Sequence, residues 1–420
     1  MVGESDRALR IAVMASAQLV RLGPSSAPPW VTQEAVQSLS LREGLPFETD
    51  EYARRKRRVC EDLERLGADA IVVFRSSSVE YLCGYHTIET VPQPLIVAPS
   101  LLQLLVPDPE VGRALVSSNA DQILFCSQFD DALRLLAEHL GRVLGAGATV
   151  AIEPLDPKMP HAFVATLLDR GLRVVHGDFL VERIRLVLSE AEVSCMERAG
   201  ETTGRGIAAA VGALASPDAT DAAVAAAARA AMAQEANSGA PLGVIVATGW
   251  RGGVVHSNWN RTAVGPGSTT FLEMSGAHHR YCAPLMQTVA HGPLSKRNRR
   301  LAELSHLMLE VVLEQARAGA ACSEVATRAL EYLGPLEDWI AFHFTFGYPV
   351  GLAHSPTWQD GAPFFITQDN PRPLESGMAF HVPASFRAFG ESGVGLSHTI
   401  LVTEKGGRVL TPGPAEVVQL

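Results

Sequence analysis

Hydrophobic and polar positions follow two different patterns along the chain. Residues 47–74 begin with a charged amphipathic stretch and end in the β-branched run AIVVF, which predicts a helix followed by a strand. Residues 130–147 have the periodicity of a second helix, and the strand-like segments around it are residues 93–99, 113–118, 122–127 and 148–154. This alternation of strands and helices predicts an α/β domain over residues 46–187.

Residues 188–420 group their helices and strands. Ser189 followed by Glu192 is a capping-box pattern that predicts the start of a long helix ending near residue 214. Two further helical patterns cover residues 220–236 and 300–319, and strand-like segments with glycine-rich turns lie between and after them. Such grouping predicts an α+β domain in which helices pack on an antiparallel sheet.

The first 45 residues form an extension ahead of these two domains. Residues 6–22 have an amphipathic pattern that predicts one helix, and a Pro/Ser-rich stretch follows it up to Trp30. We expect this extension to pack on the body of the protein or on a partner subunit.

Composition and charge narrow the function classes. The 420 residues are 47% hydrophobic and 19% charged, which is ordinary for a folded protein with two or three domains. Thirty-five Lys and Arg against 45 Asp and Glu leave a net charge of −10, which disfavours nucleic acid as a partner. No apolar run is long enough to span a bilayer and the N-terminus lacks a secretory pattern, so we expect no membrane partner and a cytoplasmic location.

The spacing of the cysteines predicts neither a metal site nor disulfide bonds. The six cysteines lie far apart and form no CxxC or Cys/His pattern. This spacing argues against a zinc site and against a disulfide framework. Buried free thiols are the simpler interpretation.

Candidate catalytic groups concentrate in the second half of the chain. Glu273 lies in a strand-like apolar segment, where a carboxylate is costly to bury unless it is paired or used. His279 and Tyr281 follow at even spacings and share a face with Glu273 if the strand is regular. An acid on an edge strand that points to solvent is the alternative. His381 likewise interrupts an apolar run, and a core histidine bonded to a backbone carbonyl is its alternative.

Two loops carry further candidates. Residues 341–361 place four polar and aromatic side chains around glycine turns, where loop residues often line pockets: His343, His354, Trp358 and Asp360. An aromatic-rich core loop is the alternative there. His256 follows a pair of glycines and precedes a Ser-Asn pair, which suits a position facing a cleft.

Taken in this order, residues 47–409 resemble the pita-bread family of creatinase and aminopeptidase P. The resemblance is carried by VEYLCGYHT at residues 79–87 and by SEAEVSCMERAGE from Ser189. It implies a creatinase-like N-terminal domain and a pita-bread catalytic domain over residues 188–420. It also implies a homodimer, in which the N-terminal domain of one subunit lies near the active site of the other.

The metallopeptidase branch of that family holds two metal ions through two Asp, one His and two Glu. Carried onto this chain, these positions fall on Glu273, Pro284, Gly347 or Tyr348, a residue near Val382, and Ser397. Four of the five therefore lack a good ligand for such ions. The resemblance implies that this chain has no dinuclear metal site and needs no cofactor.

The remaining residues are more similar to the metal-free members, creatinase and especially ectoine hydrolase. The similarity is carried by EMSGAHHRYCAPL from Glu273, GYPVGLAHSPTW from Gly347 and GMAFH ending at His381. It implies that Glu273 is the nucleophile or base and that His256 is the acid. It also implies that His279 assists and that seven further residues contact the substrate: Tyr281, His343, Tyr348, His354, Trp358, Asp360 and His381. The creatinase glutamates fall on Met286 and Ser397, which argues against creatine as the substrate.

The sequence thus predicts a metal-independent hydrolase, or a related cyclase, that acts on a C–N bond. Cyclic amidines, guanidino compounds and N-acyl amino acids are the expected substrates. An Xaa-Pro-type metallopeptidase is the first alternative. A noncatalytic pita-bread protein that binds a partner is the second.

Overall fold

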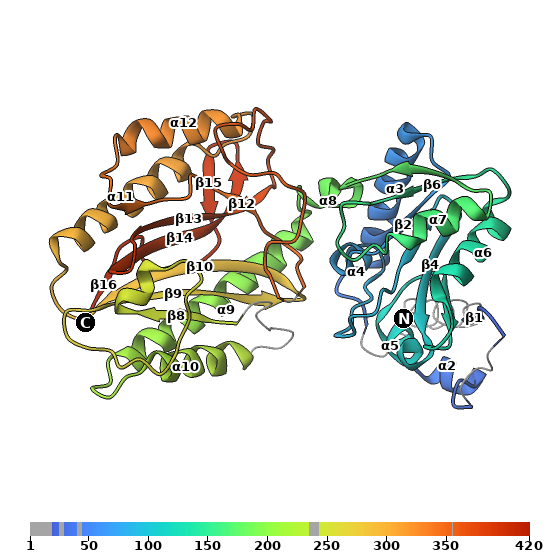
Figure 1. Cartoon of the computed structure of the whole chain (residues 1–420), viewed down its shortest axis with the longest axis horizontal. Coiled ribbons are helices and arrows are strands. Elements are labelled where there is room, and N and C mark those ends of the chain that lie inside the picture. The colour runs from blue at the N-terminus through green and yellow to red at the C-terminus, as the bar shows by residue number, and fades with distance from the viewer. Residues whose placement is uncertain (1–18, 25–28, 40–43, 235–242, 355) are drawn as a thin grey trace, which may run out of the picture. The chain divides into compact units, whose positions relative to one another are not determined.

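The computed structural model describes residues 19–24, 29–39, 44–234, 243–354 and 356–420, and divides the chain into an N-terminal unit up to Ile184 and a C-terminal unit from Arg185 (Figure 1). The sequence placed this boundary between residues 187 and 188. The predicted α/β class of the first part and α+β class of the second are both confirmed.

The N-terminal unit contains a seven-stranded mixed sheet with helices packed on it. The strands lie in the order β1-β5-β4-β3-β2-β6-β7, with these bounds: β1 (Leu19–Arg21), β2 (Ala70–Val73), β3 (Leu95–Ala98), β4 (Leu101–Pro107), β5 (Gln122–Cys126), β6 (Thr149–Ile152) and β7 (Arg173–His176). The helical segments are α2 (Gln33–Leu39), α3 (Thr49–Leu66), α4 (Ser76–Cys83), η1 (Asp108–Glu110), α5 (Val111–Ser117), α6 (Ala132–Leu144), α7 (Ala162–Asp169) and α8 (Leu180–Arg185).

Helix α3 shows why the charged segment at the start of this unit folds onto the sheet. Its buried residues recur every three or four positions and include Arg55, whose side chain is fully buried. The Arg55 guanidinium lies over the rings of Phe47 and Tyr81 and donates to the Tyr81 carbonyl at 2.8 Å. It also donates to Glu51 Oε1 at 2.9 Å, so the buried cation is neutralised within its own helix.

Two predictions for this unit need correction. Residues 113–118, expected as a strand, lie at the end of α5, because the Pro-containing turn η1 starts a helix that the Ala-Leu pair continues. The helix expected over residues 6–22 lies mostly outside the described residues. At its end, Leu19–Arg21 form β1, which pairs in parallel with β5 and so packs on the body of the same unit.

The C-terminal unit contains two sheets. The first has the order β16-β10-β9-β8, and the second β11-β13-β14-β15 with β12 paired to β13. The bounds of its elements are α9 (Glu190–Leu214), α10 (Asp221–Ala233), β8 (Ile245–Thr248), η2 (Gly249–Gly253), β9 (Thr269–His278), β10 (Tyr281–Ala290), α11 (Lys296–Gln315), α12 (Cys322–Leu333), β11 (Ile340–Ala341), β12 (Tyr348–Pro349), β13 (Ala379–Ala388), β14 (Ser392–Thr403), β15 (Gly406–Val409) and β16 (Val418–Gln419).

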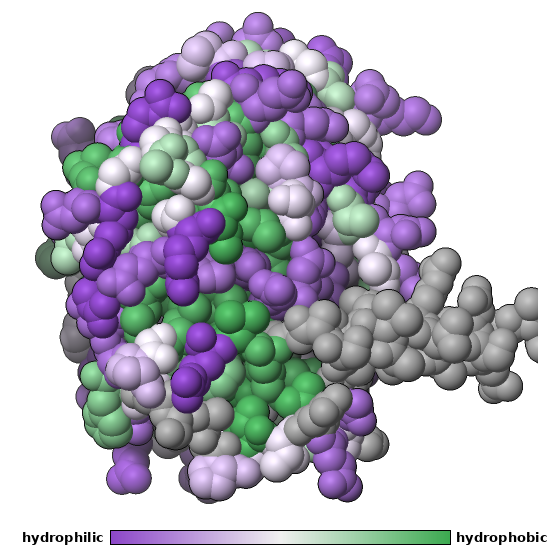
Figure 2. Space-filling view, turned by 90° about the vertical axis from the view of Figure 1, so that its right-hand side faces the viewer, coloured by the Kyte–Doolittle hydropathy of each residue, from purple (hydrophilic) through white to green (hydrophobic). Residues whose placement is uncertain are grey.

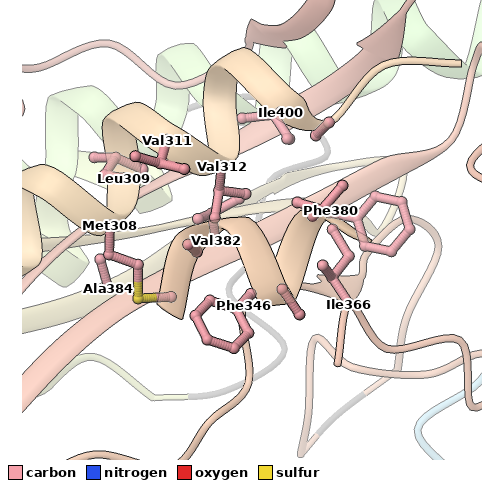
Figure 3. Packing of buried hydrophobic residues seen from close by; sticks show 14 of the residues in the cluster. Met308, Leu309, Val311, Val312, Phe346, Ile366, Phe380, Val382, Ala384 and Ile400 are labelled. Carbon is pink, nitrogen blue, oxygen red and sulfur yellow. The ribbon is translucent and has the colours of Figure 1, made fainter. Parts of the chain in front are cut away.

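Each sheet buries one face under a pair of helices. Leu272, Met274 and Leu285 pack with residues of α9 and α10 in one hydrophobic cluster. On the second sheet, Val382 and its neighbours of like parity on β13 pack with α11 and α12, as Figure 3 shows for Met308 and Val312. Because side chains alternate along a strand, the residues in between face the other way. The functional candidates Glu273 on β9 and His381 on β13 lie on the faces that point away from the helices.

Hydroxyl groups join the two sheets where β10 and β14 meet. Ser397 Oγ accepts from the Met286 backbone N–H at 2.6 Å, and Thr399 Oγ1 donates to the Pro284 carbonyl at 2.8 Å. Thr288 Oγ1 donates to the Gly395 carbonyl at 3.1 Å and accepts from the Gly395 N–H at 2.9 Å. These side chains are buried, so each bond satisfies groups that water does not reach.

None of the helices described is both long enough and apolar enough to cross a membrane. Figure 2, viewed from the side of the N-terminal unit, shows hydrophobic residues gathered among hydrophilic ones. Exposed large apolar side chains of that unit include Ile88, Phe129 and Leu155. All six cysteines are free thiols.

The capping box predicted at the start of α9 is confirmed. Ser189 Oγ accepts from the Glu192 N–H at 3.3 Å, and Glu192 Oε2 accepts from the Ser189 N–H at 2.9 Å. Glu192 Oε1 also accepts from the buried Tyr281 hydroxyl at 2.8 Å. The cap therefore ties the first turn of α9 to the start of β10.

We predict that Ser189→Ala lowers the free energy of unfolding of the C-terminal unit by about 1 kcal/mol, because an N-cap is lost. Glu192→Ala should cost about 2 kcal/mol or more, since the buried Tyr281 hydroxyl also loses this acceptor. Urea unfolding followed by tryptophan fluorescence measures both, because four of the five tryptophans lie in this unit.

The control is Ser194→Ala, an exposed serine one turn further along the same helix. Its change should stay within about 0.5 kcal/mol. An equal loss in all three variants would contradict the importance of the capping box.

Candidate active site

A cavity of about 810 Å³ lies in the C-terminal unit and is lined by residues of β8, β9, β10 and β13 and of the loops beside them. Five of the ten predicted site residues line it: His256, Glu273, His343, Tyr348 and Trp358. Its volume is within the usual range for small-molecule sites. The remaining wall is mostly apolar and includes Ile245, Val255, Met286, Phe342, Phe365 and Pro383.

Glu273 lies in the middle of the first sheet. Strand β9 pairs on both sides, so that Glu273 is opposite Ile245 of β8 and Met286 of β10. Glu273 is 7% exposed, and its carboxyl group has no hydrogen-bond partner among the described residues. Burial raises the pKa of Glu273 to about 7, and the charge of Arg387 opposes the rise. The alternative of an edge-strand acid pointing to solvent is therefore wrong.

Arg387 and Ser385, which the sequence reasoning missed, extend the polar wall along β13. Both line the cavity, and Arg387 Nη1 donates to Ser385 Oγ. The guanidinium lies over the ring of Phe271, 4.8 Å from its centroid. His381, Pro383, Ser385 and Arg387 alternate with residues of the apolar core, so the period of two that singles out His381 also predicts Arg387.

His381 is the centre of a buried hydrogen-bond chain behind the cavity wall. Its Nδ1 lies 2.6 Å from Tyr348 Oη, and its Nε2 lies 2.6 Å from Ser397 Oγ. Trp358 Nε1 donates to the same Tyr348 oxygen at 2.9 Å. The alternative of a histidine bonded to a backbone carbonyl is wrong, since both ring nitrogens meet hydroxyl groups.

The donor and the acceptor of each hydrogen bond around His381 follow from which atoms carry protons. Ser397 Oγ already accepts from the Met286 N–H, and the only acceptor for its own proton among the described residues is His381 Nε2. Burial, together with the charge of His398, lowers the pKa of His381 to about 3, so the ring is neutral. His381 then carries its proton on Nδ1 and donates it to Tyr348. Among the described residues, the hydroxyl proton of Tyr348 then has no acceptor.

His256 reaches the cavity from the loop after η2. Its backbone is in the left-handed region, with φ of 58°, and the residue is exposed. The loop lies close against the turn between β13 and β14, where a Cβ on Gly253 would overlap the carbonyl oxygen of Ala388. Only glycine permits this approach, and it places His256 at the rim. His343 is a second exposed histidine in the lining.

Besides His381, four predicted residues do not line the cavity. The chain reverses after His278, so that His279 lies in the β9–β10 turn and Tyr281, opposite His278, bonds to Glu192 instead. The expectation that both share a strand face with Glu273 is wrong, because one regular strand does not run through residues 273–281. His354 lies in the loop after β12, and Asp360 offers its backbone carbonyl to Arg185 at 3.1 Å.

The side chains present do not fit a metal pair. Within the described part of the chain, no group of three or more His, Cys, Asp or Glu residues is placed to hold a metal ion. One metal-ligand position of the family falls near Val382, whose side chain is in the core that faces the helices. Its neighbour Pro383 lines the cavity and is opposite Ser397. The hydroxyls of Ser397 and Tyr348 are bonded to His381 and form a hydrogen-bonded chain.

The chain is similar to known proteins over both units. Residues 194–404 match the model of "Metallopeptidase family M24", and residues 55–187 that of the "Creatinase/Prolidase N-terminal domain". A protein of Sinorhizobium fredii described as an uncharacterized hydrolase/peptidase is 27% identical over 394 residues, covering 88% of this chain and 97% of that protein. Ectoine hydrolase of Halomonas elongata is 29% identical over 177 residues, covering 41% of this chain and 43% of that protein.

Solved structures share the fold. An Xaa-Pro dipeptidase from Bacillus anthracis matches with a TM-score of 0.76 at 17% identity and covers 88% of this chain and 100% of that one. At this identity the match supports the two-domain architecture and says nothing about substrate.

We predict that one glutamate carboxyl of the cavity titrates near pH 7 and that its signal is lost in Glu273→Gln. Carbon-13 NMR of protein labelled at the glutamate carboxyl measures this directly. In Arg387→Met the same carboxyl should titrate above pH 7, because the cation that lowers its pKa is gone.

Glu153 in the N-terminal unit provides the internal control. Burial and the neighbouring Glu182 and Asp156 raise its pKa as well, so Glu153→Gln removes a different signal. A Glu273 carboxyl that titrates at the ordinary value near 4.5 would show that the site is hydrated and would contradict the prediction.

Proposed function

This chain belongs to metallopeptidase family M24, and within that family we propose that it hydrolyses a C–N bond of a small molecule without a metal ion. The observation that carries the proposal is Glu273, a buried carboxyl with a raised pKa that lines the cavity, while no group of three or more His, Cys, Asp or Glu among the described residues is placed to hold a metal ion. Hydrolysis without a metal hydroxide requires a carboxylate nucleophile or a base that activates water.

In the proposed reaction, the ionised Glu273 oxygen attacks the carbon of the substrate's C–N bond. The C–N bond breaks as the leaving nitrogen takes a proton, and the substrate carbon stays bonded to Glu273. Water then adds to this carbon and releases the product with its new C–OH group, which restores the Glu273 carboxylate. The sum is one water consumed for each C–N bond broken.

Two other side chains have the chemistry that these steps need. His256 at the cavity rim is the proposed acid that protonates the leaving nitrogen. Tyr348 supplies a hydroxyl proton that its neighbours His381 and Trp358 leave unused. Burial, together with the charge of Glu273, raises the pKa of Tyr348 above its ordinary value, so the group donates a hydrogen bond without ionising.

The similarity to ectoine hydrolase supports a cyclic amidine, a guanidino compound or an N-acyl amino acid as substrate, and the same chemistry in reverse supports a cyclase. The names of other relatives favour an Xaa-Pro peptidase. Against a peptidase of that type stand Pro284, Pro383 and Ser397, which lie at or beside three of the metal-ligand positions and offer no good ligand. The homodimer and the cytoplasmic location stay predictions.

We predict that incubation with a suitable substrate gives a stoichiometric covalent adduct, visible by intact-mass analysis, which is absent in Glu273→Gln. The panel comprises ectoine, its ring-opened product, other cyclic amidines and N-acyl amino acids. The matched control is Glu404→Gln, on an exposed turn, which should behave as the wild type. Metal is quantified in the same samples and should be substoichiometric.

Two bound metal ions per chain would contradict the metal-independent reaction and favour the peptidase. Turnover without an adduct, abolished in Glu273→Gln, would assign Glu273 as a base that activates water. Neither turnover nor adduct on any panel member, with no metal bound, would favour a noncatalytic binding protein.

We predict that Tyr348→Phe lowers kcat on the substrate so identified by about 10²–10³-fold, the usual effect of losing one donor to the developing charge. KM should change much less. The control is Tyr332→Phe, an exposed tyrosine on α12, which should leave both parameters unchanged. A rise in KM with kcat unchanged would reassign Tyr348 to ground-state binding.

A further inference from the structure

Arg387 is a buried cation without an ionic partner among the residues that the structure describes. The residue is 6% exposed on the cavity wall, and its Nε is buried with no hydrogen-bond acceptor in the described part of the chain. Its contacts among the described residues are the hydrogen bond to Ser385 and the stacking on Phe271. No Asp or Glu in that part of the chain lies within 4.0 Å of the guanidinium nitrogens.

A cation in this position is costly to maintain. Buried charges in proteins are normally paired, because an unpaired one loses its hydration without gaining a counter-charge. The buried Arg55 of the N-terminal unit follows that rule through Glu51. Glu273 affects Arg387 electrostatically but is not bonded to it. The missing counter-charge is therefore expected from a molecule that enters the cavity.

The shape of the guanidinium specifies the anion. A guanidinium presents its N–H groups in a plane that matches the two oxygens of a carboxylate. The surroundings specify the rest of the ligand, because the cavity wall is mainly apolar and aromatic: Ile245, Val255, Met286, Phe342, Trp358 and Phe365. A ligand that matches both the guanidinium and the apolar cavity wall has a carboxylate at one end and an apolar group elsewhere.

We propose that Arg387 binds the carboxylate of the substrate and that the substrate is an N-acyl amino acid with an apolar acyl group. This inference rests on the proposed hydrolase function and narrows its substrate class. Arg387 on β13 and Glu273 on β9 belong to different sheets and line the same cavity. The carboxylate is held by one sheet while the amide carbon is presented to the nucleophile of the other.

Binding is measured by calorimetry with N-benzoylglycine and its uncharged carboxamide, which differ only in the group that Arg387 would contact. Glu273→Gln is used alongside the wild type, because it binds without turnover. The carboxylate should bind about 10- to 100-fold more tightly than the carboxamide, as expected for a charged hydrogen bond in a buried site. Arg387→Met should abolish this preference.

The matched control is Arg251→Met, which removes a cation near the cavity that does not line it and should keep the preference. Arg387→Lys should keep part of it. Equal binding of the two probes, a preference that survives in Arg387→Met, or no binding of the carboxylate would each overturn the inference. If Arg387→Met does not fold, the comparison of the two probes on the wild type decides alone.

These outcomes are separable from the test of the hydrolase function. A carboxylate preference that depends on Arg387, with no hydrolysis of N-acyl amino acids or amidines, supports the anion site and counts against the enzyme. Hydrolysis that depends on Glu273, with carboxylate and carboxamide bound equally, supports the enzyme and counts against the anion site.

Discussion

The C-terminal unit depends on the junction at which β10 and β14 hold two separate sheets together. Ser397, Thr399 and Thr288 replace a backbone ladder there, each bonding a main-chain group of the other sheet. Buried hydroxyl-to-backbone bonds are directional, so they fix how the sheets face one another more narrowly than apolar packing does. With the helices covering the outer faces, the cavity between the inner-facing residues follows from this arrangement.

The cavity keeps two opposite charges apart on apolar walls. Glu273 and Arg387 interact electrostatically, yet each lacks a direct ionic partner among the described residues. A direct ion pair would satisfy both groups and leave neither available to a ligand. Burial raises the pKa of the carboxyl, and the guanidinium keeps a donor without an acceptor among the described residues, so both groups can interact with a molecule that brings the complementary chemistry.

The same junction includes Ser397, which is at one of the positions that the family resemblance assigns to metal ligands. Ser397 accepts from the Met286 amide and donates to His381, which in turn orients Tyr348. A serine, a tyrosine and a neutral buried histidine satisfy one another's hydrogen bonds, and each is thereby held in one orientation. Ser397 and Tyr348, at positions that the resemblance assigns to metal ligands, thus belong to a hydrogen-bond network, of which Tyr348 lines the cavity.

The sequence by itself determined the two fold classes, the helix start at Ser189 and the location of Glu273 in a buried apolar strand, because these depend on local periodicity and capping. The residues around His256 predicted that it faces a cleft, and the family resemblance added the proposed role as the acid. Only the tertiary structure separated Tyr281 from the cavity, since a hairpin turn changes which residues share a face. It also added Arg387 as a cavity residue: the alternation along β13 places Arg387 on the same face as His381, but that this face and Glu273 line one cavity depends on packing between strands far apart in the chain.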